Sequence, residues 1–310
     1  MTNKRPHVIL VLGPHVQGVE KCLPAVVAAE KPVALLHESS DSRSKQLEIL
    51  QKLRGASGID VKFPKSFLLG MHTFAREHNL EHDLVGPADE VEAEADDVVF
   101  NTSSIEMSST IKAAQQGNVD EMVKFGHRVF SALSFLERSA SSRYTSFLTE
   151  KARQAKGPVL AYIGTAHTAL VKDLVHRGVK VTLYAVQRGD PVSPAVPSSG
   201  HLISKPVVLR EVLRQLLTVY LEDRYKFTNQ HNAFAEQYLP ELTKLRQVPL
   251  SRFEHFIASS KDSTPVGFRV RFVDFLKQNG VHLPSNDEVA ERLRKEFVPG
   301  VRKVKVFEPK

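Results

Sequence analysis

Three short apolar runs most constrain what this chain can fold into. Val8–Leu12 and Val159–Ile163 each contain five apolar residues and stop at a glycine, and Val33–Leu36 is a third run of the same kind. Runs of this length are typical of strands that are buried on both faces, as in parallel sheets. The residues between Val8–Leu12 and Val33–Leu36 have helical spacing, so residues 8–36 are predicted to form a strand–helix–strand unit.

The same reasoning predicts the other elements of this region. A further strand is expected over 179–186, and Pro24 should kink the helix over 16–30 or lie in its first turn. Six acidic residues between Asp89 and Asp97 predict a solvated loop over 81–97. Helices are expected over 44–53, 66–78, 107–116, 119–136, 143–154 and 168–177. Together these elements predict an α/β fold, with a central and mainly parallel sheet flanked by helices.

A change of composition divides the chain near residue 190. Residues 191–200 belong to a stretch rich in proline, serine and glycine, which is typical of a linker or loop. Residues 201–310 contain 19 basic and 13 acidic side chains, whereas 1–200 are nearly neutral. We therefore predict an α/β domain over 1–190, a linker or loop over 191–200, and a basic, mostly helical C-terminal region over 201–310.

Composition excludes several classes of protein. Of the 310 residues, 42% are hydrophobic and 25% are charged, which is ordinary for a globular protein. The single cysteine, Cys22, excludes a disulfide framework and a cysteine-based zinc site, and its place in a helix predicts an inert buried thiol. No apolar run approaches the roughly 18–20 residues that a membrane span needs. These features predict a protein of the reducing cytoplasm, and they leave a homo-oligomer open.

Three polar residues follow three of the predicted strands. His15 and His167 each lie two or three residues after a glycine, and Glu38 closes the strand that begins at Val33. The carboxyl ends of parallel strands meet at one edge of a sheet, where α/β proteins bind their ligands. Two imidazoles and a carboxylate suit a divalent metal, activation of water, or metal-free acid–base chemistry. Taken singly, each histidine is also compatible with a helix cap or a satisfied core residue.

The order of these motifs resembles the superfamily that contains TraB/PrgY, Tiki and erythromycin-esterase/ChaN-like proteins. The resemblance covers about residues 7–186 and departs from the family pattern at three positions, Leu12, Tyr144 and Phe147. These departures are compatible with a drifted site or with loss of catalysis in a retained fold. The matching segments are Leu12-Gly-Pro-His15, Lys31–Glu38, Arg43, the helix through Glu137-Arg138 and Arg143–Phe147, and Val159–Gly178.

The resemblance implies a peptidase-like or esterase-like hydrolase that activates water and acts on a small molecule or peptide. Glu38 is then the general base or a metal ligand, and His15 and His167 are catalytic as metal ligands or proton carriers. A divalent metal at His15, Glu38 and His167 is the cofactor that this implies. Arg43 and Arg143 are candidates for holding a carboxylate or oxyanion, because arginine offers a planar fork of donors. Each is equally compatible with a surface or helix-supporting role.

Two alternatives to a hydrolase follow from the sequence. One is an inactive small-molecule-binding or scaffold protein of the same fold, which binds a partner through the basic C-terminal region and its closing segment Val301–Lys305. Nucleic-acid binding is less expected, because the basic residues alternate with acidic ones and no known motif is present. We expect His37 to point away from the site, and His72, His78 and His82 to be surface residues.

Overall fold

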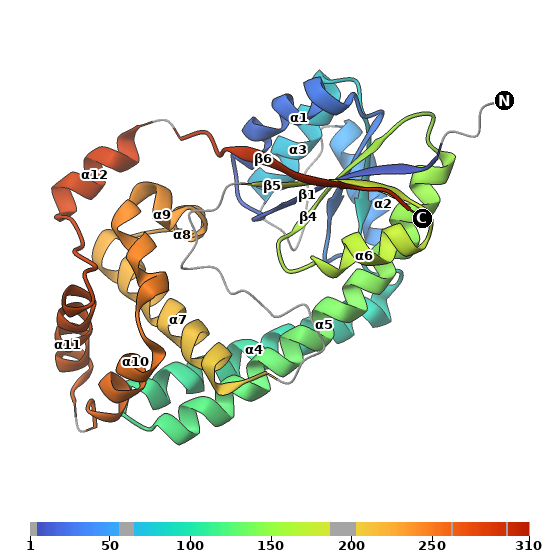
Figure 1. Ribbon diagram of the computed structural model, residues 1–310. Coiled ribbons are helices and arrows are strands. Elements are labelled where there is room, and N and C mark those ends of the chain that lie inside the picture. The colour runs from blue at the N-terminus through green and yellow to red at the C-terminus, as the bar shows by residue number, and fades with distance from the viewer. Residues whose placement is uncertain (1–4, 56–64, 187–202, 262, 296, 310) are drawn as a thin grey trace. The chain divides into compact units, whose positions relative to one another are not determined.

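The computed structural model describes residues 5–55, 65–186, 203–261, 263–295 and 297–309. These residues form two compact units. The first unit comprises residues 1–98, 135–187 and 298–310, and the second comprises residues 99–134 and 188–297. The first unit holds a six-stranded sheet in the order β3-β2-β4-β1-β5-β6 (Figure 1).

The predicted apolar runs form the middle of this sheet. β1 (His7–Gly13) pairs in parallel with β4 (Val159–Gly164) on one side and with β5 (Lys180–Val186) on the other. β2 (Ala34–Glu38) lies in parallel between β4 and β3 (Glu81–Val85). Only β6 (Val301–Phe307) is antiparallel, and it pairs with β5. The predicted α/β fold with a mainly parallel sheet is confirmed.

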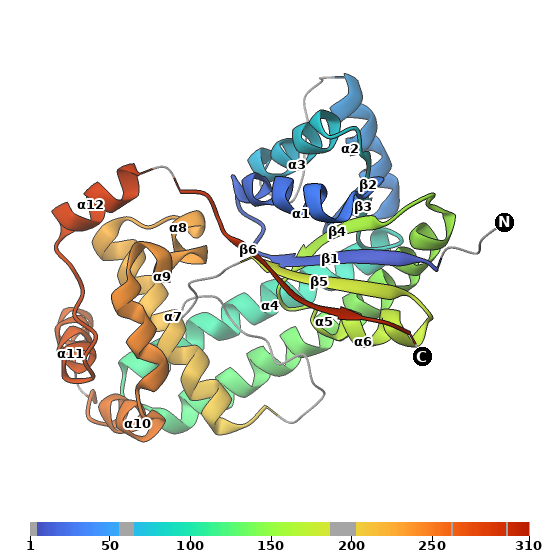
Figure 2. The ribbon, with the colours of Figure 1, turned by 45° about the horizontal axis from the view of Figure 1, so that its top comes forward.

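Helices cover both faces of the sheet (Figure 2). On one face lie η1 (Val19–Cys22), α1 (Leu23–Glu30), α2 (Arg43–Gly55) and α3 (Lys65–Glu77). On the other face lie α6 (Ala169–His176) and residues 135–154 of α5 (Val119–Gln154). Pro24 lies in the first turn of α1, where its missing N–H costs no helical hydrogen bond.

The α5–α6 face of the sheet packs a continuous apolar core. Leu10 and Ala161 from the central strands are fully buried there against Leu148 of α5 and Leu170 of α6. Burying apolar side chains of this size contributes roughly 1.5–3 kcal/mol each. This layer therefore fixes α5 against the carboxyl half of the sheet, and α5 carries several of the polar residues described below.

The loop predicted over 81–97 is wrong. Residues Glu81–Val85 form the edge strand β3, and Glu90 begins helix α4 (Glu90–Gln115). β3 lacks the apolar-run signal because its buried side chains include His82 and Asp83. The acidic residues that suggested a loop lie instead in the first turns of α4, where negative charge is favourable for a helix.

Two predicted helices merge into one, and another begins earlier than expected. α5 runs without a break from Val119 to Gln154, across the predicted gap between 136 and 143. α4 begins 17 residues before the predicted start at 107. The hydroxyls of Ser104, Ser108 and Ser109 donate to main-chain carbonyls four residues earlier, so these polar residues are accommodated inside the helix.

The second unit is helical throughout its described residues, as predicted for most of the C-terminal region. Its aromatic core includes Phe253, Phe256 and Phe275, with Phe256 stacked on Phe275 at a centroid separation of 4.8 Å. No helix in the described part of the chain is long and apolar enough to cross a membrane. The helices of the second unit after residue 203 are α7 (Lys205–Tyr225), α8 (Asn229–Ala233), α9 (Ala235–Tyr238), η2 (Pro240–Gln247), α10 (Leu250–Ala258), α11 (Pro265–Gln278) and α12 (Asn286–Arg294).

The compact units divide the chain differently from the predicted 1–190 and 201–310. Residues 99–134 belong with the second unit, and residues 298–310 belong with the first. The closing basic segment Val301–Lys305 is part of β6, so the C-terminal region is not helical to its end. The predicted linker over 191–200 lies outside the described residues.

Candidate functional site

His15, Glu38 and His167 converge at the carboxyl edge of the sheet. The three residues follow or end β1, β2 and β4, which are neighbours in the order β2-β4-β1. The Nε2 atom of His15 lies 3.3 Å from Oε2 of Glu38, and the Nε2 atom of His167 lies 3.2 Å from Oε1. One partly buried carboxylate, 12% exposed, therefore has an imidazole at each of its two oxygens.

Two glycines that face each other across the β1–β4 pair allow close approach at these strand ends, and one of them borders the cluster. The main-chain N–H of Gly164 donates to Oε2 of Glu38 at 2.7 Å, and a Cβ at Gly164 would lie only 3.0 Å from that oxygen. Gly13, its register partner, lies under Tyr162, where a Cβ would be 2.1 Å from the phenol oxygen. Both positions require glycine because of close approach.

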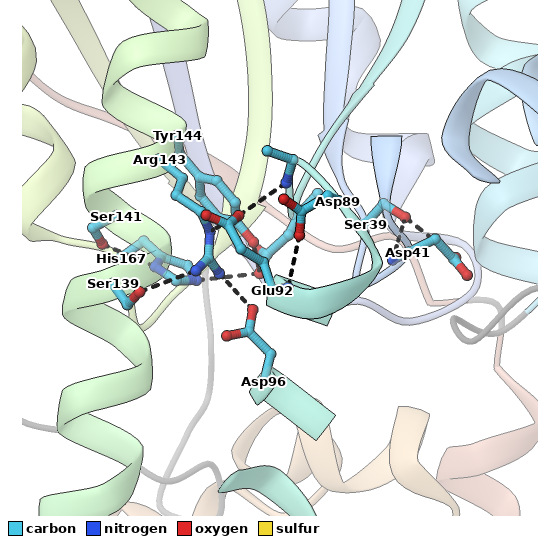
Figure 3. Close-up of polar contacts among 12 residues, drawn as sticks. Ser39, Asp41, Asp89, Glu92, Asp96, Ser139, Ser141, Arg143, Tyr144 and His167 are labelled. Carbon is cyan, nitrogen blue, oxygen red and sulfur yellow. Dashed lines mark hydrogen bonds and ion pairs between the residues drawn. The ribbon is translucent and has the colours of Figure 1, made fainter. Parts of the chain in front are cut away.

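Helix α5 adds residues that the sequence reasoning did not place in the site (Figure 3). Tyr144 donates its hydroxyl proton to Oε1 of Glu38 at 3.1 Å. Ser141 Oγ lies 3.0 Å from Nδ1 of His167, and the same hydroxyl donates to Oε1 of Glu137 at 3.2 Å. Glu137, Ser141 and Tyr144 are spaced by four and three residues, which is one face of a helix, and that spacing was visible in the sequence.

The charges of the cluster stabilise one another. Burial alone raises the pKa of Glu38, but its electrostatic interactions with His167 and His15, with hydrogen bonds from His167 and Gly164, outweigh burial and hold this pKa well below its usual range. Burial alone lowers the pKa of His167, but the negative charge of Glu38 and its hydrogen bond raise it above the ordinary value. Burial, and then Glu38, raise the pKa of Tyr144 well above its usual range.

The hydrogen-bond directions determine where the protons of His167 lie. Ser141 has a single hydroxyl proton, which it gives to Glu137, so Ser141 Oγ accepts a proton from Nδ1 of His167. Glu38 is ionised and can only accept, so Nε2 of His167 also carries a proton. His167 is therefore an imidazolium whose Nε2–H faces Glu38 and whose Nδ1–H faces Ser141, with a further hydrogen bond to the main chain of Glu137.

The two candidate substrate-binding arginines make contacts within the first unit. Arg143 lies beside Tyr144 on α5, but its guanidinium binds Asp96, approaches Glu92 and donates to Ser139 (Figure 3). A role for Arg143 in binding a substrate stays a prediction.

Arg43 is the first residue of α2, and its side chain contacts β3. Its guanidinium donates to both carboxylate oxygens of Asp83, at 2.9 and 3.2 Å, and to the carbonyl of Leu84. The guanidinium also lies 5.1 Å from the ring centre of Phe147. These contacts support the fold, and a substrate-binding role for Arg43 stays a prediction.

A second group of histidines lies beside the cluster. His37 is buried and its Nδ1 atom lies 3.0 Å from Nε2 of His82, whose Nδ1 atom lies 3.0 Å from Nδ1 of His72. Burial, followed by the charge of His72, lowers the pKa of His82 to about 3, and burial also lowers the pKa of His37 well below its usual range. The expectation that His82 is a surface residue is wrong, because β3 carries it into the sheet layer.

Cys22 is buried, as expected, and burial raises the pKa of its thiol to about 12. A thiol with such a pKa is protonated at neutral pH and reacts slowly. It contributes packing rather than chemistry.

The described residues contain no group of three or more histidine, cysteine, aspartate or glutamate side chains that could hold a metal ion. Both imidazole Nε2 atoms face oxygens of Glu38 instead of sharing a common point with them. The divalent metal implied by the resemblance stays a prediction.

Comparison with known proteins finds no family that matches the chain, no curated relative and no similar solved structure. The resemblance to TraB, Tiki and erythromycin-esterase proteins therefore stays a prediction from the motifs.

Proposed function

We propose that the chain is a hydrolase of esters or peptides, in which His15 and His167 act as base and acid on either side of Glu38. The observation that carries this proposal is the single, partly buried carboxylate with an imidazole at each oxygen. General acid–base catalysis of this kind contributes about 10²–10⁴-fold to a rate.

Each residue of the cluster has a separate task in this proposal. The imidazole of His15 takes a proton from the attacking water, because its side chain is the more exposed of the two, at 17% against 8% for His167. Water adds to the substrate carbonyl, and His167 gives a proton to the leaving oxygen or nitrogen as the bond to carbon breaks. A proton transfer from His15 back to His167, directly or through water, restores the starting state.

Glu38 orients the two histidines and stabilises the positive charge of His167 before the reaction and of His15 once it has taken the proton from water. Its low pKa makes it a weak base, since proton affinity follows pKa. Its oxygens are already occupied by Tyr144, His167 and the N–H of Gly164. This favours the orienting role over the general-base role that the sequence suggested, in the manner of the carboxylate in a catalytic triad.

Hydrolysis of simple probes tests the proposal. The full chain is assayed on p-nitrophenyl acetate and on a fluorogenic peptide mixture, beside His15→Ala and the surface control His255→Ala. The proposal expects the wild type and the control to share one rate, with His15→Ala slower by about 10²-fold or more. Equal rates for all three proteins on every probe would overturn it.

A metal-dependent form of the same reaction is tested separately. Protein purified without chelator is analysed for bound zinc, manganese and iron, beside His167→Ala. A stoichiometric metal that is lost in His167→Ala would replace the metal-free form proposed above. Activity that survives chelator treatment without bound metal would support the metal-free form.

The alternative of an inactive protein with a partner on its basic C-terminal region remains a prediction. Two arginines of this region already have partners within the second unit. Arg269 binds Asp223, and Arg214 lies 2.9 Å from a carboxylate oxygen of Glu211. We therefore favour the hydrolase, and absence of hydrolysis on all probes would favour the alternative.

A further inference from the structure

Glu137 is a buried acid that the proposed reaction does not use. Only 3% of the residue is exposed, and its Oε1 atom accepts the hydroxyl proton of Ser141 at 3.2 Å. Its Oε2 atom is buried and has no hydrogen-bond partner among the described residues. Half of the carboxyl group is therefore unsatisfied.

Such a group is costly for the fold. A buried polar atom that lacks a partner destabilises a protein by about 1–3 kcal/mol. Burial also raises the pKa of Glu137, although the charge of His167 and the hydrogen bond from Ser141 lower it in part. An apolar side chain would pack at this position without that cost, so stability does not explain the choice of glutamate.

The contacts of Ser141 connect this acid to His167. The serine is 2% exposed, and its hydroxyl lies between Oε1 of Glu137 and Nδ1 of His167. Because the hydroxyl proton goes to Glu137, the oxygen accepts from the His167 ring. If the His167 ring were flipped about its Cβ–Cγ bond, ring carbons would face Ser141 and Glu38 in place of the two nitrogens. The contact with Ser141 therefore favours the orientation seen in the structure.

We propose that Glu137 and Ser141 are positioning residues that hold the His167 ring with its Nε2–H facing Glu38 and the substrate. This inference rests on the proposed function, in which His167 is the acid. It adds a second set of residues behind the histidine, distinct from Tyr144, which holds Glu38 directly. Hydrogen-bonded residues of this kind commonly fix the orientation of a working imidazole.

Nuclear magnetic resonance of the histidine-labelled full chain tests the positioning directly, without a substrate. Buried and hydrogen-bonded ring N–H protons exchange slowly enough to be observed, and His167→Gln assigns those of His167. The expected result is two such signals in the wild type. Ser141→Ala is expected to shift and weaken the Nδ1–H signal, Ser141→Thr to retain it, and the exposed neighbour Ser142→Ala to leave both signals unchanged.

Substitution of Glu137 separates positioning from stability. Glu137→Leu is expected to unfold at the same temperature as the wild type or higher, because the unsatisfied oxygen is gone, yet to weaken the Nδ1–H signal. Glu137→Gln keeps an acceptor for Ser141 and is expected to retain that signal. Both signals unchanged in Ser141→Ala and Glu137→Leu would overturn the inference.

The two proposals fail in different ways. If the wild type hydrolyses the probes, Ser141→Ala is expected to lower kcat by about 10-fold or more with little change in KM, because an orientation effect acts on the transition state. Hydrolysis with unchanged ring signals in Ser141→Ala would refute the positioning alone. If the wild type hydrolyses none of the probes but Ser141→Ala still changes the ring signals, the hydrolase is refuted and the ring contacts remain supported.

Discussion

The main-chain N–H of Gly164 donates to the Oε2 atom of Glu38 across the β4–β2 pair, and the absence of a side chain at Gly164 is what allows the carboxylate to come this close. The contact explains why a glycine ends the strand at this point. It also links β4, which precedes His167, to β2, which carries Glu38.

Gly164→Ala is therefore expected to displace Glu38. The added Cβ would lie 3.0 Å from Oε2, with His15 and His167 behind it, so the fold should lose about 1–3 kcal/mol. Urea denaturation measures this loss. Gly55→Ala is the matched control, because nothing lies within 4 Å of a Cβ at Gly55 and a stability equal to or above that of the wild type is expected there.

Arg43→Lys is expected to destabilise the first unit. The substitution removes the paired contact of the guanidinium with Asp83 and its hydrogen bond to Leu84, which together should cost about 1–3 kcal/mol. Denaturation of the variant is compared with that of Arg128→Lys, whose exposed contact with Glu106 should have little effect. If stability were unchanged and KM on a probe rose instead, Arg43 would be a substrate-binding residue.

As the pH is lowered, the protein should begin to lose stability at a pH well above the usual pKa of carboxyl groups. The pKa of His82 is about 3 in the folded chain and 6.5 is its ordinary value, so between these pH values the unfolded chain binds the extra proton. Stability should therefore fall as the pH falls below about 6.5, by at most roughly 1.4 kcal/mol per pH unit for each such histidine. His82→Gln should flatten this slope, which urea denaturation at several pH values measures.

The Glu38–His167 pair should show the opposite dependence on the alkaline side. The raised pKa of His167 adds stability that is complete below its ordinary value of 6.5 and is lost as the pH rises through the folded pKa. The lowered pKa of Glu38 adds stability that is complete above 4.5 and is lost only in stronger acid. The stability difference between the wild type and Glu38→Gln should thus be largest between about pH 4.5 and 6.5 and shrink at higher pH. A difference that stays constant from acid to alkaline pH would contradict this ion pair.

The sequence predicted those strands that consist of a continuous run of apolar residues. Val8–Leu12 and Val159–Ile163 lie in the middle of the sheet, and the carboxyl ends of their strands bring His15 and His167 together as expected. β3 escaped prediction because its buried His82 and Asp83 are satisfied by distant partners, His37 and Arg43, which no local pattern reveals. Tertiary contacts decide such positions.

The site was predictable to the same extent. Strand ends located His15, Glu38 and His167, because parallel strands share one carboxyl edge. Arg43 and Arg143 were chosen from the resemblance and from residue type, and their acidic neighbours Asp83 and Asp96 are distant in the sequence. Glu137, Ser141 and Tyr144 share a helix face, but only the packing of α5 on the sheet shows that this face meets the site.

The most direct test of the central claim is the kcat/KM for p-nitrophenyl acetate in a double-mutant cycle of Glu38→Gln and His167→Gln. If the two residues act as one unit, each single variant should lose about 10²-fold or more, and the double variant should lose no more than the worse single variant. Losses that multiply in the double variant, or rates equal to that of the wild type in all three, would contradict the account.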